Sequence, residues 1–399
     1  MRRATIRIAL AALGVLAVAA PAAFAAQRGA FPTAAQCPYC GGDPELMASA
    51  GVVSHGPLAL GSDGSEALQK LLPEYEWRFL ETQHLRWASS LPNANLSAKE
   101  RKRLEPELER LRILLPSMPR KVKSLDPWLR LHLLAMRGEE FYARFQSLLG
   151  VSDADFAETR AADGPFMGDG RYLGEKDKFE VVLHERRASH EIFTRVRTGV
   201  KVTDALRWHS KDPHKLILSA PCEDGDLRED RWLWPYLVHN LSHMLLAAYK
   251  HFSYDPPVWL DEGLAHAMEK EAEPESWTRE GEEGAYRERG RSSNWPDRAR
   301  ELAGKKRAPA LAELLRRNTV GEFSDDEHVA IWAAVRHLLD AHSLSFARFL
   351  GEVSGQLDER GYPSGRDLVG LQRRALREIW EWAPADLDSS WQAAFSGKD

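Results

Sequence analysis

The sequence predicts an α+β protein, in which an N-terminal α/β lobe with a small mixed sheet is followed by an all-helical C-terminal lobe. Two patterns carry this prediction: short apolar runs typical of strands stop after Ala220, whereas stretches with helical spacing continue to Phe395. Of the 399 residues, 43% are hydrophobic and 28% charged, which excludes a disordered, collagen-like or disulfide-dense chain. The formal net charge is −5, without the excess of positive charge that is typical of nucleic-acid-binding proteins, so we expect no nucleic-acid partner.

Residues 1–25 have the pattern of a secretory signal peptide. Three arginines lie within the first seven residues, an apolar run follows from Ile8 to Ala20, and Ala23-Phe24-Ala25 is a small-x-small cleavage signal. The alternative is an uncleaved N-terminal anchor. We expect cleavage, no membrane span in the mature chain, and an exported protein that is periplasmic or extracellular.

Residues 26–72 are expected to be an irregular segment that contains two of the three cysteines. Cys37-Pro38-Tyr39-Cys40 has the letters of a redox motif, but turn residues follow it where such a motif needs a helix. We predict a local structural disulfide between Cys37 and Cys40, or half of a metal clip, with Cys222 left reduced. A redox centre at the C-P-Y-C motif remains an alternative.

Residues 73–225 form the predicted α/β lobe. Ser97 and Glu100 occupy capping-box positions, and Asp126 precedes a proline at the first position of another helix. The expected strands are a pair within 75–89, then 179–184, 205–210 and 215–220. The expected helices are 97–114, 126–149 and 189–197, and residues 162–177 form a polar, glycine-rich stretch.

Residues 226–399 form the predicted helical lobe, which carries the candidate metal site. We expect helices at about 227–249 and 258–271 and four or five more over 308–395. The charged, glycine-bearing stretch from Pro274 to Lys306 predicts a mobile excursion between them.

The helix over 227–249 carries His239 and His243. Histidines at i and i+4 lie on one helix face, about 6 Å apart along the axis, so both imidazoles can reach one ion. With 14 histidines in the chain, a pair at this spacing arises readily by chance, so the context matters. The surrounding helix is almost wholly apolar, and the carboxylate of Glu262 lies near the start of the next helix. Together these three side chains predict a zinc site with one open position.

These motifs resemble the gluzincin metallopeptidases of the peptidase MA superfamily. His239-x-x-x-His243 followed by Trp259-Leu260-Asp261-Glu262-Gly263-Leu264-Ala265 is similar to their H-E-x-x-H and W-L-x-E-G-x-A helices. The resemblance covers about residues 179–396, but only the two helical motifs are specific. It implies a zincin-like fold, zinc ligands at His239, His243 and Glu262, and Lys215 to Ala220 as the edge strand that lines a substrate cleft.

The chain departs from the family at Asn240, which stands where the family has the general-base glutamate. An amide cannot take a proton from a metal-bound water, and loss of this help typically costs about 10²–10⁴ in rate. Asp261 is a candidate substitute base, although neighbouring positions on a helix do not share a face. His328 is either a group that steadies a developing oxyanion or simply a surface histidine, and His266 is a candidate partner of the metal ligands.

Three hypotheses follow. The first is an exported zincin-fold protein that keeps its zinc but is catalytically impaired, and that binds a peptide or protein in its cleft. The second is an active zinc peptidase with a non-standard base. The third is a redox or metal-binding protein centred on the C-P-Y-C motif. Only Asn240 separates the first two at the level of sequence.

Overall fold

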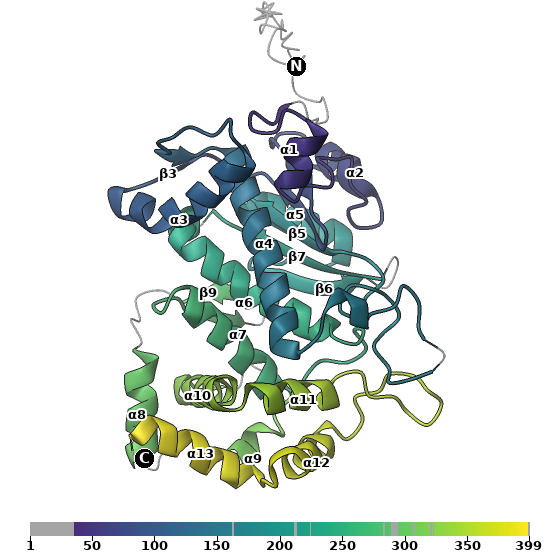
Figure 1. The fold of residues 1–399 in the computed structure, drawn as a ribbon, viewed down its shortest axis with the longest axis vertical. Coiled ribbons are helices and arrows are strands. Elements are labelled where there is room, and N and C mark those ends of the chain that lie inside the picture. Colours follow the sequence, from purple (N-terminus) through teal and green to yellow (C-terminus); the bar gives the residue numbers. More distant parts are fainter. Residues whose placement is uncertain are drawn as a thin grey trace, which may run out of the picture.

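The computed structural model describes residues 36–397 with the exception of 162, 211–213, 224, 282–283, 289–293, 306–307, 320 and 322. The predicted signal peptide therefore lies outside the described residues. The described chain is mixed α/β, with a small mixed sheet and many helices (Figure 1). None of the described helices is both long enough and apolar enough to traverse a lipid bilayer.

Five strands form the main sheet in the order β1-β2-β5-β7-β6. The central pairs β2–β5 and β5–β7 are parallel, and each outer strand is antiparallel to its neighbour. The strands are β1 (Arg78–Glu81), β2 (Leu85–Ser89), β5 (Phe179–His184), β6 (Leu206–Ser210) and β7 (Lys215–Pro221). The predicted strand pair within 75–89 is confirmed as an antiparallel hairpin. Lys215 to Ala220 is not the edge strand, because β6 pairs with its outer side and takes the edge position.

Helices cover both faces of this sheet. The remaining elements of the first half are α1 (Pro44–Ser49), α2 (Gly64–Leu71), β3 (Ala94–Asn95), α3 (Ala98–Leu114), β4 (Ser124–Leu125), α4 (Pro127–Leu149) and α5 (Arg187–Thr198). α4 packs against β1 and β2, and α5 packs against β5 and β7. The caps of α3 and α4 are those the sequence predicts: Ser97 and Glu100 form a capping box, and the Asp126 carboxylate accepts two backbone N–H bonds.

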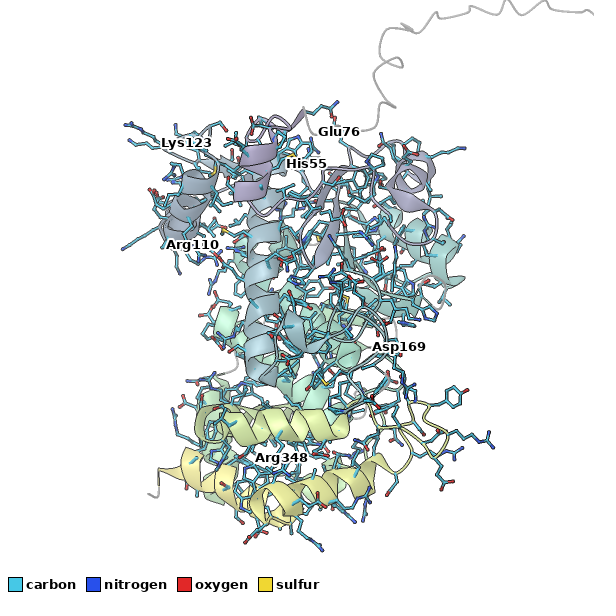
Figure 2. The ribbon with its side chains drawn as sticks, turned by 45° about the vertical axis from the view of Figure 1, so that its right-hand side comes forward. His55, Glu76, Arg110, Lys123, Asp169 and Arg348 are labelled. Carbon is cyan, nitrogen blue, oxygen red and sulfur yellow. The ribbon has the colours of Figure 1, made fainter. Side chains whose placement is uncertain are left out.

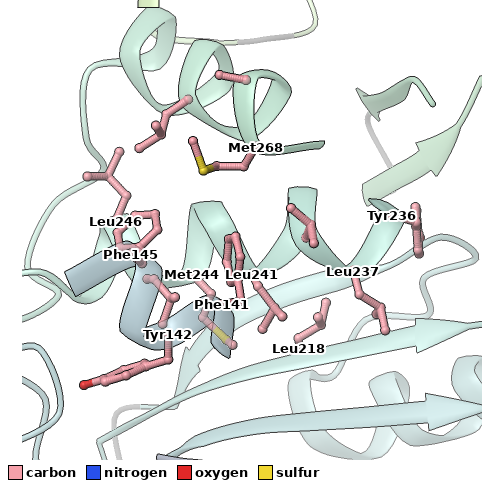
Figure 3. Close-up of a cluster of buried hydrophobic side chains, with 14 of the residues drawn as sticks. Phe141, Tyr142, Phe145, Leu218, Tyr236, Leu237, Leu241, Met244, Leu246 and Met268 are labelled. Atoms are coloured by element: carbon pink, nitrogen blue, oxygen red, sulfur yellow. The ribbon is translucent and has the colours of Figure 1, made fainter. Parts of the chain in front are cut away.

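The main core lies where α4 meets the helices that follow β7. α6 (Asp230–Ala248) packs on β7, on α4 and on α7 (Val258–Ala272). Figure 3 shows this cluster, with Phe141 and Phe145 from α4, Leu241 from α6 and Met268 from α7. The apolar run that surrounds the two histidines in the sequence is therefore buried on several sides, which fixes the position of α6 against the sheet.

Within the described residues after α7, the named elements are one hairpin and a series of helices. The hairpin pairs β8 (Thr278–Gly281) with β9 (Gly284–Arg287). The later helices are α8 (Trp295–Lys305), α9 (Leu311–Leu314), α10 (Asp325–Ala341), α11 (Ser343–Val353), α12 (Leu368–Trp380) and α13 (Pro384–Ser396). The stretch 274–306, for which the sequence predicts a mobile excursion, contains the hairpin and α8 among its described residues, and it buries Trp277, Ala285 and Trp295.

Candidate metal centre

α6 brings His239 and His243 to one side of the helix, one turn apart. Both side chains are almost fully buried, as is Asn240 between them. Their Nε2 atoms face each other at 3.2 Å. Two imidazole nitrogens at this separation can share one proton in a hydrogen bond, or both can turn their lone pairs to one cation.

Glu262 and Glu280 complete a group of four potential ligands with these histidines. Glu262 comes from the first turns of α7 and Glu280 from β8, and one ligand atom from each of the four side chains lies within 4.8 Å of the others. Glu262 is fully buried, and the side chain of Glu280 is 16% exposed. The sequence predicted three of these residues as metal ligands, and the structure brings those three together.

The spacing of the ligand atoms matches a small tetrahedral ion. With bonds of about 2.0–2.1 Å, the nitrogen and oxygen ligands of tetrahedral zinc lie about 3.3–3.4 Å apart. His243 Nε2 lies 3.3 Å from Glu262 Oε2. Glu280 Oε1 lies 3.6 Å from His239 Nε2 and 3.7 Å from His243 Nε2. In addition, neither carboxylate oxygen of Glu262 has a hydrogen-bond donor in good geometry among the described residues. A cation would therefore fit the donor set.

Each histidine of the pair presents its other nitrogen to a carboxylate. His243 Nδ1 lies 2.8 Å from Asp261 Oδ2, and His239 Nδ1 lies 3.2 Å from Glu269 Oε2. The hydroxyls of Ser276 and Thr278 donate to the other oxygen of Glu269. Carboxylates in this position hold the imidazole in the tautomer whose Nε2 is free for a metal. Asp261 thus contacts the nitrogen of His243 that points away from the ligand cluster.

His266 and His328 lie on the far side of Glu262. His266 Nε2 is 3.0 Å from Glu262 Oε1, and His328 Nδ1 is 3.4 Å from the same oxygen. Both rings are buried, so the interpretation of His328 as a surface histidine is wrong. His328 is linked to the ligand cluster through the carboxylate of Glu262 and through His266. The Nε2 atom of His266 lies 3.0 Å from the Nδ1 atom of His328.

Asn240 is engaged by an arginine of the edge strand β6. Arg207 Nη1 donates to Asn240 Oδ1 at 2.5 Å, and Arg207 Nη2 lies 2.8 Å from Glu280 Oε1. The amide of Asn240 in turn donates to the carbonyl of Tyr236 one turn earlier. The residue between the two histidines on α6 is therefore a neutral amide that is already bonded on both sides.

The electrostatics of the cluster favour a bound cation. Burial alone would lower the pKa of His239, but the carboxylates of Glu269 and Glu280 raise it to about 10. Burial alone would raise the pKa of Glu280, but Arg207 and then His239 lower it to about 2. Burial opposes ionisation of Glu262 too, yet the histidines around it hold its pKa well below the ordinary value. The carboxylates of Asp261, Glu262, Glu269 and Glu280 stabilise positive charge on the imidazoles, and a divalent cation would supply that charge.

Sequence reasoning missed Glu280 and Arg207. Glu280 lies in a charged stretch where nothing distinguishes it from its acidic neighbours, and Arg207 is a single arginine in a short strand. The pairing of Ala205 with Ala285 joins the hairpin that carries Glu280 to the start of the strand that carries Arg207. No local spacing rule connects these segments, so the sequence offered no usable signal.

The cysteines differ from the predicted disulfide. Cys37, Cys40 and Cys222 are all buried and are free thiols in the structure. Cys37 and Cys40 instead face two histidines, His55 and His132, and these four residues are a second group of potential metal ligands.

The comparisons with known proteins leave the family open. No family model matches the chain, and a search of the curated proteins finds no match either.

Proposed function

We propose that the chain is an exported, zinc-binding, zincin-like protein that has lost peptidase chemistry and acts by binding a peptide or protein. The observation that carries the proposal is the convergence of His239, His243, Glu262 and Glu280 beside an asparagine bonded to Arg207. Export rests on the N-terminal signal pattern alone.

The loss of catalysis follows from two features of the cluster. A catalytic zinc has three protein ligands and an open position for water, whereas a zinc with four protein ligands is closed. Glu280 Oε1 lies where it can supply the fourth ligand atom. Asn240 has no titratable proton near neutral pH, so it cannot serve as the general base.

Asp261 does not replace that base. A base must be within hydrogen-bond reach of the metal-bound water, and Asp261 lies at the opposite nitrogen of His243. We therefore assign Asp261 the role of orienting His243, and we assign His328 the role of supporting Glu262. No observation in the structure favours an active peptidase over the impaired one.

The metal part of the proposal is tested by zinc content. We expect His239→Asn combined with His243→Asn to lower the zinc bound per purified chain by one equivalent. His337→Asn is the matched control, because His337 hydrogen-bonds Ser390 outside the cluster and should leave the zinc content unchanged. Equal zinc in the double variant and the wild type would contradict the proposal.

The catalytic part is tested by peptide hydrolysis with and without a chelator. We expect the wild type to remain at background. Asn240→Glu alone should also remain there, because Arg207 would pair with the new carboxylate and Glu280 would still close the site. Combining Asn240→Glu with Glu280→Ala and Arg207→Ala removes the fourth metal ligand and leaves the new carboxylate without its arginine partner. Chelator-sensitive activity should then rise above that of the wild type. Chelator-sensitive hydrolysis by the wild type would contradict the proposal.

Binding of an extended peptide would use the edge strand β6. A peptide can extend a sheet by adding a strand to its edge, and the chain's own β9 already pairs with Ala205 just before β6. We expect an added peptide ligand to slow hydrogen exchange of the amides of Leu206–Ser210. If a peptide binds the protein but leaves the hydrogen exchange of these amides unchanged, this mode of binding is contradicted.

A further inference from the structure

We propose that Cys37, Cys40, His55 and His132 form a second metal site, a closed structural zinc site at the start of the described chain. One ligand atom from each side chain lies within 4.8 Å of the other three. The site shares no residue with the centre on α6 and α7, and the proposal does not depend on the proposed function. Figure 2 labels His55 near the top of the molecule and Arg348, on α11, in its lower part.

The geometry pairs each thiol with one imidazole. Cys37 Sγ lies 3.2 Å from His132 Nε2, and Cys40 Sγ lies 3.1 Å from His55 Nε2. In a tetrahedral zinc site with Zn–S of about 2.3 Å and Zn–N of about 2.0–2.1 Å, sulfur and nitrogen ligands lie about 3.6 Å apart. The measured distances are within about half an ångström of this value, so small side-chain shifts would accommodate the ion.

The imidazole of His55 is already oriented for coordination. Its Nδ1 lies 3.2 Å from the carbonyl oxygen of Phe79 on β1. A carbonyl only accepts, so Nδ1 must carry the proton and Nε2 presents its lone pair to Cys40. Such a hydrogen bond to the second nitrogen is typical of metal-bound histidines.

The backbone holds the two cysteines in place. The N–H of Gly41 bonds to the carbonyl of Cys37, and the N–H of Asp43 bonds to the carbonyl of Cys40. Between the cysteines, the hydroxyl of Tyr39 donates to Asp126, the residue that caps α4. His132 lies in the second turn of α4, so this cap brings the Cys-x-x-Cys turn to the helix that carries the fourth ligand.

Burial and charge both favour a metal over free thiols. The four residues are each at most 2% exposed, and a thiol is a weak hydrogen-bond donor, so the two imidazole lone pairs would otherwise be poorly satisfied. Binding of Zn²⁺ releases the two thiol protons, and the two thiolates neutralise the ion. Two thiolates with two imidazoles at C-x₂-C spacing are a ligand set that selects zinc.

The structure around the C-P-Y-C motif also fits a metal site better than a redox site. The helix that such a motif needs immediately after it is replaced by a turn and the short helix α1. Thiolates bound to zinc would be protected from forming the disulfide that an oxidising compartment otherwise favours.

Cobalt substitution of the full-length protein tests the proposal. We expect the cobalt(II)-loaded wild type to show sulfur-to-cobalt charge-transfer absorption, which the histidine and carboxylate centre cannot produce. Cys37→Ser combined with Cys40→Ser should abolish this absorption and lower bound zinc by one equivalent. The variant His239→Asn with His243→Asn should keep the absorption while losing its own equivalent, which separates this proposal from the proposed function.

Two further measurements complete the test. Cys222→Ala is the matched control for a buried cysteine outside the cluster, and it should leave the absorption and the zinc content unchanged. Thiol titration of freshly purified wild type, denatured in chelator without reductant, should find three thiols. Absence of charge-transfer absorption in the wild type, or a titre of one thiol with Cys37 and Cys40 in a disulfide, would overturn the proposal even if the cysteine variant fails to fold.

Discussion

At the scale of single residues, the candidate centre depends on which atom of each side chain faces the ligand cluster. Asp261 and Glu262 are neighbours in the sequence, yet Glu262 faces the Nε2 atom of His243 and Asp261 faces its Nδ1 atom. This difference arises because adjacent positions on a helix point about 100° apart. In the proposed centre the two carboxylates therefore have different roles, one as a ligand and one as an orienting group.

Asp261→Asn should weaken zinc binding without unfolding the protein. The change removes the charge that orients His243, and loss of such a partner typically lowers metal affinity about 10–100-fold. Competition with a chelator of known affinity, measured on the wild type and the variant, checks this. Asp340→Asn is the control, because Asp340 forms an exposed i,i+4 pair with Arg336 on α10. An unchanged zinc affinity in Asp261→Asn would show that Asp261 does not orient the ligand.

We expect Glu175 to make the free energy of unfolding depend on pH in the acidic range. Burial opposes its ionisation, but His209, His251 and the N–H of Phe252 lower its pKa to about 2. Because this value lies below that of the unfolded chain, the contribution to stability is present above about pH 4.5 and is lost as the pH falls towards 2. Asp169 also contacts His251, and the imidazole of His214 lies beside those of His209 and His251, so both are further titratable groups of the network.

The measurement is the free energy of unfolding of the wild type and Glu175→Gln between pH 7 and pH 2.5. We expect the variant to be less stable at pH 7 by at most about 3 kcal/mol, and the difference to shrink steadily below pH 4.5. A difference that stays constant with pH would contradict this role for Glu175.

At the scale of elements, the position of α7 against α10 depends on close packing at Gly263. A Cβ atom there would lie 2.8 Å from Val335 Cγ2 and 2.9 Å from the carbonyl oxygen of Ile331. The second contact is with the backbone of α10, which cannot move aside as the end of a flexible side chain can. Gly263, the residue after Glu262, therefore allows the two helices to approach closely.

Gly263→Ala should destabilise the protein by about 1–3 kcal/mol, as expected for overpacking. Gly304→Ala is the matched control: Gly304 lies in α8 and a Cβ there meets no atom within 4 Å. This control should stabilise by roughly 0.5–1 kcal/mol, because alanine is the better helix former. Denaturant unfolding of both variants checks the pair, and equal effects of the two changes would rule out close packing as the reason for Gly263.

At the scale of the whole molecule, the two candidate metal centres tie together segments that are far apart in the chain. The first joins α6, α7 and the β8–β9 hairpin. The second joins the Cys-x-x-Cys turn to His55 and to α4, whose later residues pack against α6 and α11. An ion that binds the folded chain and not the unfolded one stabilises the fold by mass action.

Removal of metal should therefore lower the thermal unfolding midpoint. With free zinc at about 100 times its dissociation constant, one site contributes about 2.7 kcal/mol, which corresponds to a shift of several degrees for a domain of ordinary size. Scanning calorimetry with excess zinc and with chelator checks this in the wild type. The shift should be smaller when either centre is removed by substitution. An identical midpoint in zinc and chelator would mean that neither centre stabilises the fold.

The sequence by itself determined the features that depend on neighbours along the chain. The capped helices follow from Ser97 with Glu100 and from Asp126, because capping joins residues only three or four positions apart. The shared face of His239 and His243 follows from the helical repeat in the same way. The predicted α+β class is supported in its coarser form, a mixed α/β chain with a small mixed sheet, because strand and helix patterns differ in period.

Only the tertiary structure decided which distant residues complete each centre. His132 meets Cys37 across 95 positions, and Arg207 meets Asn240 across 33. The edge position of β6, the burial of His328 and the approach of Glu280 likewise depend on how the strands pair and the helices pack. A charged or imidazole side chain has the same local preferences whether it faces solvent or an ion, so its role emerges only when packing removes the water around it and brings other ligands within reach.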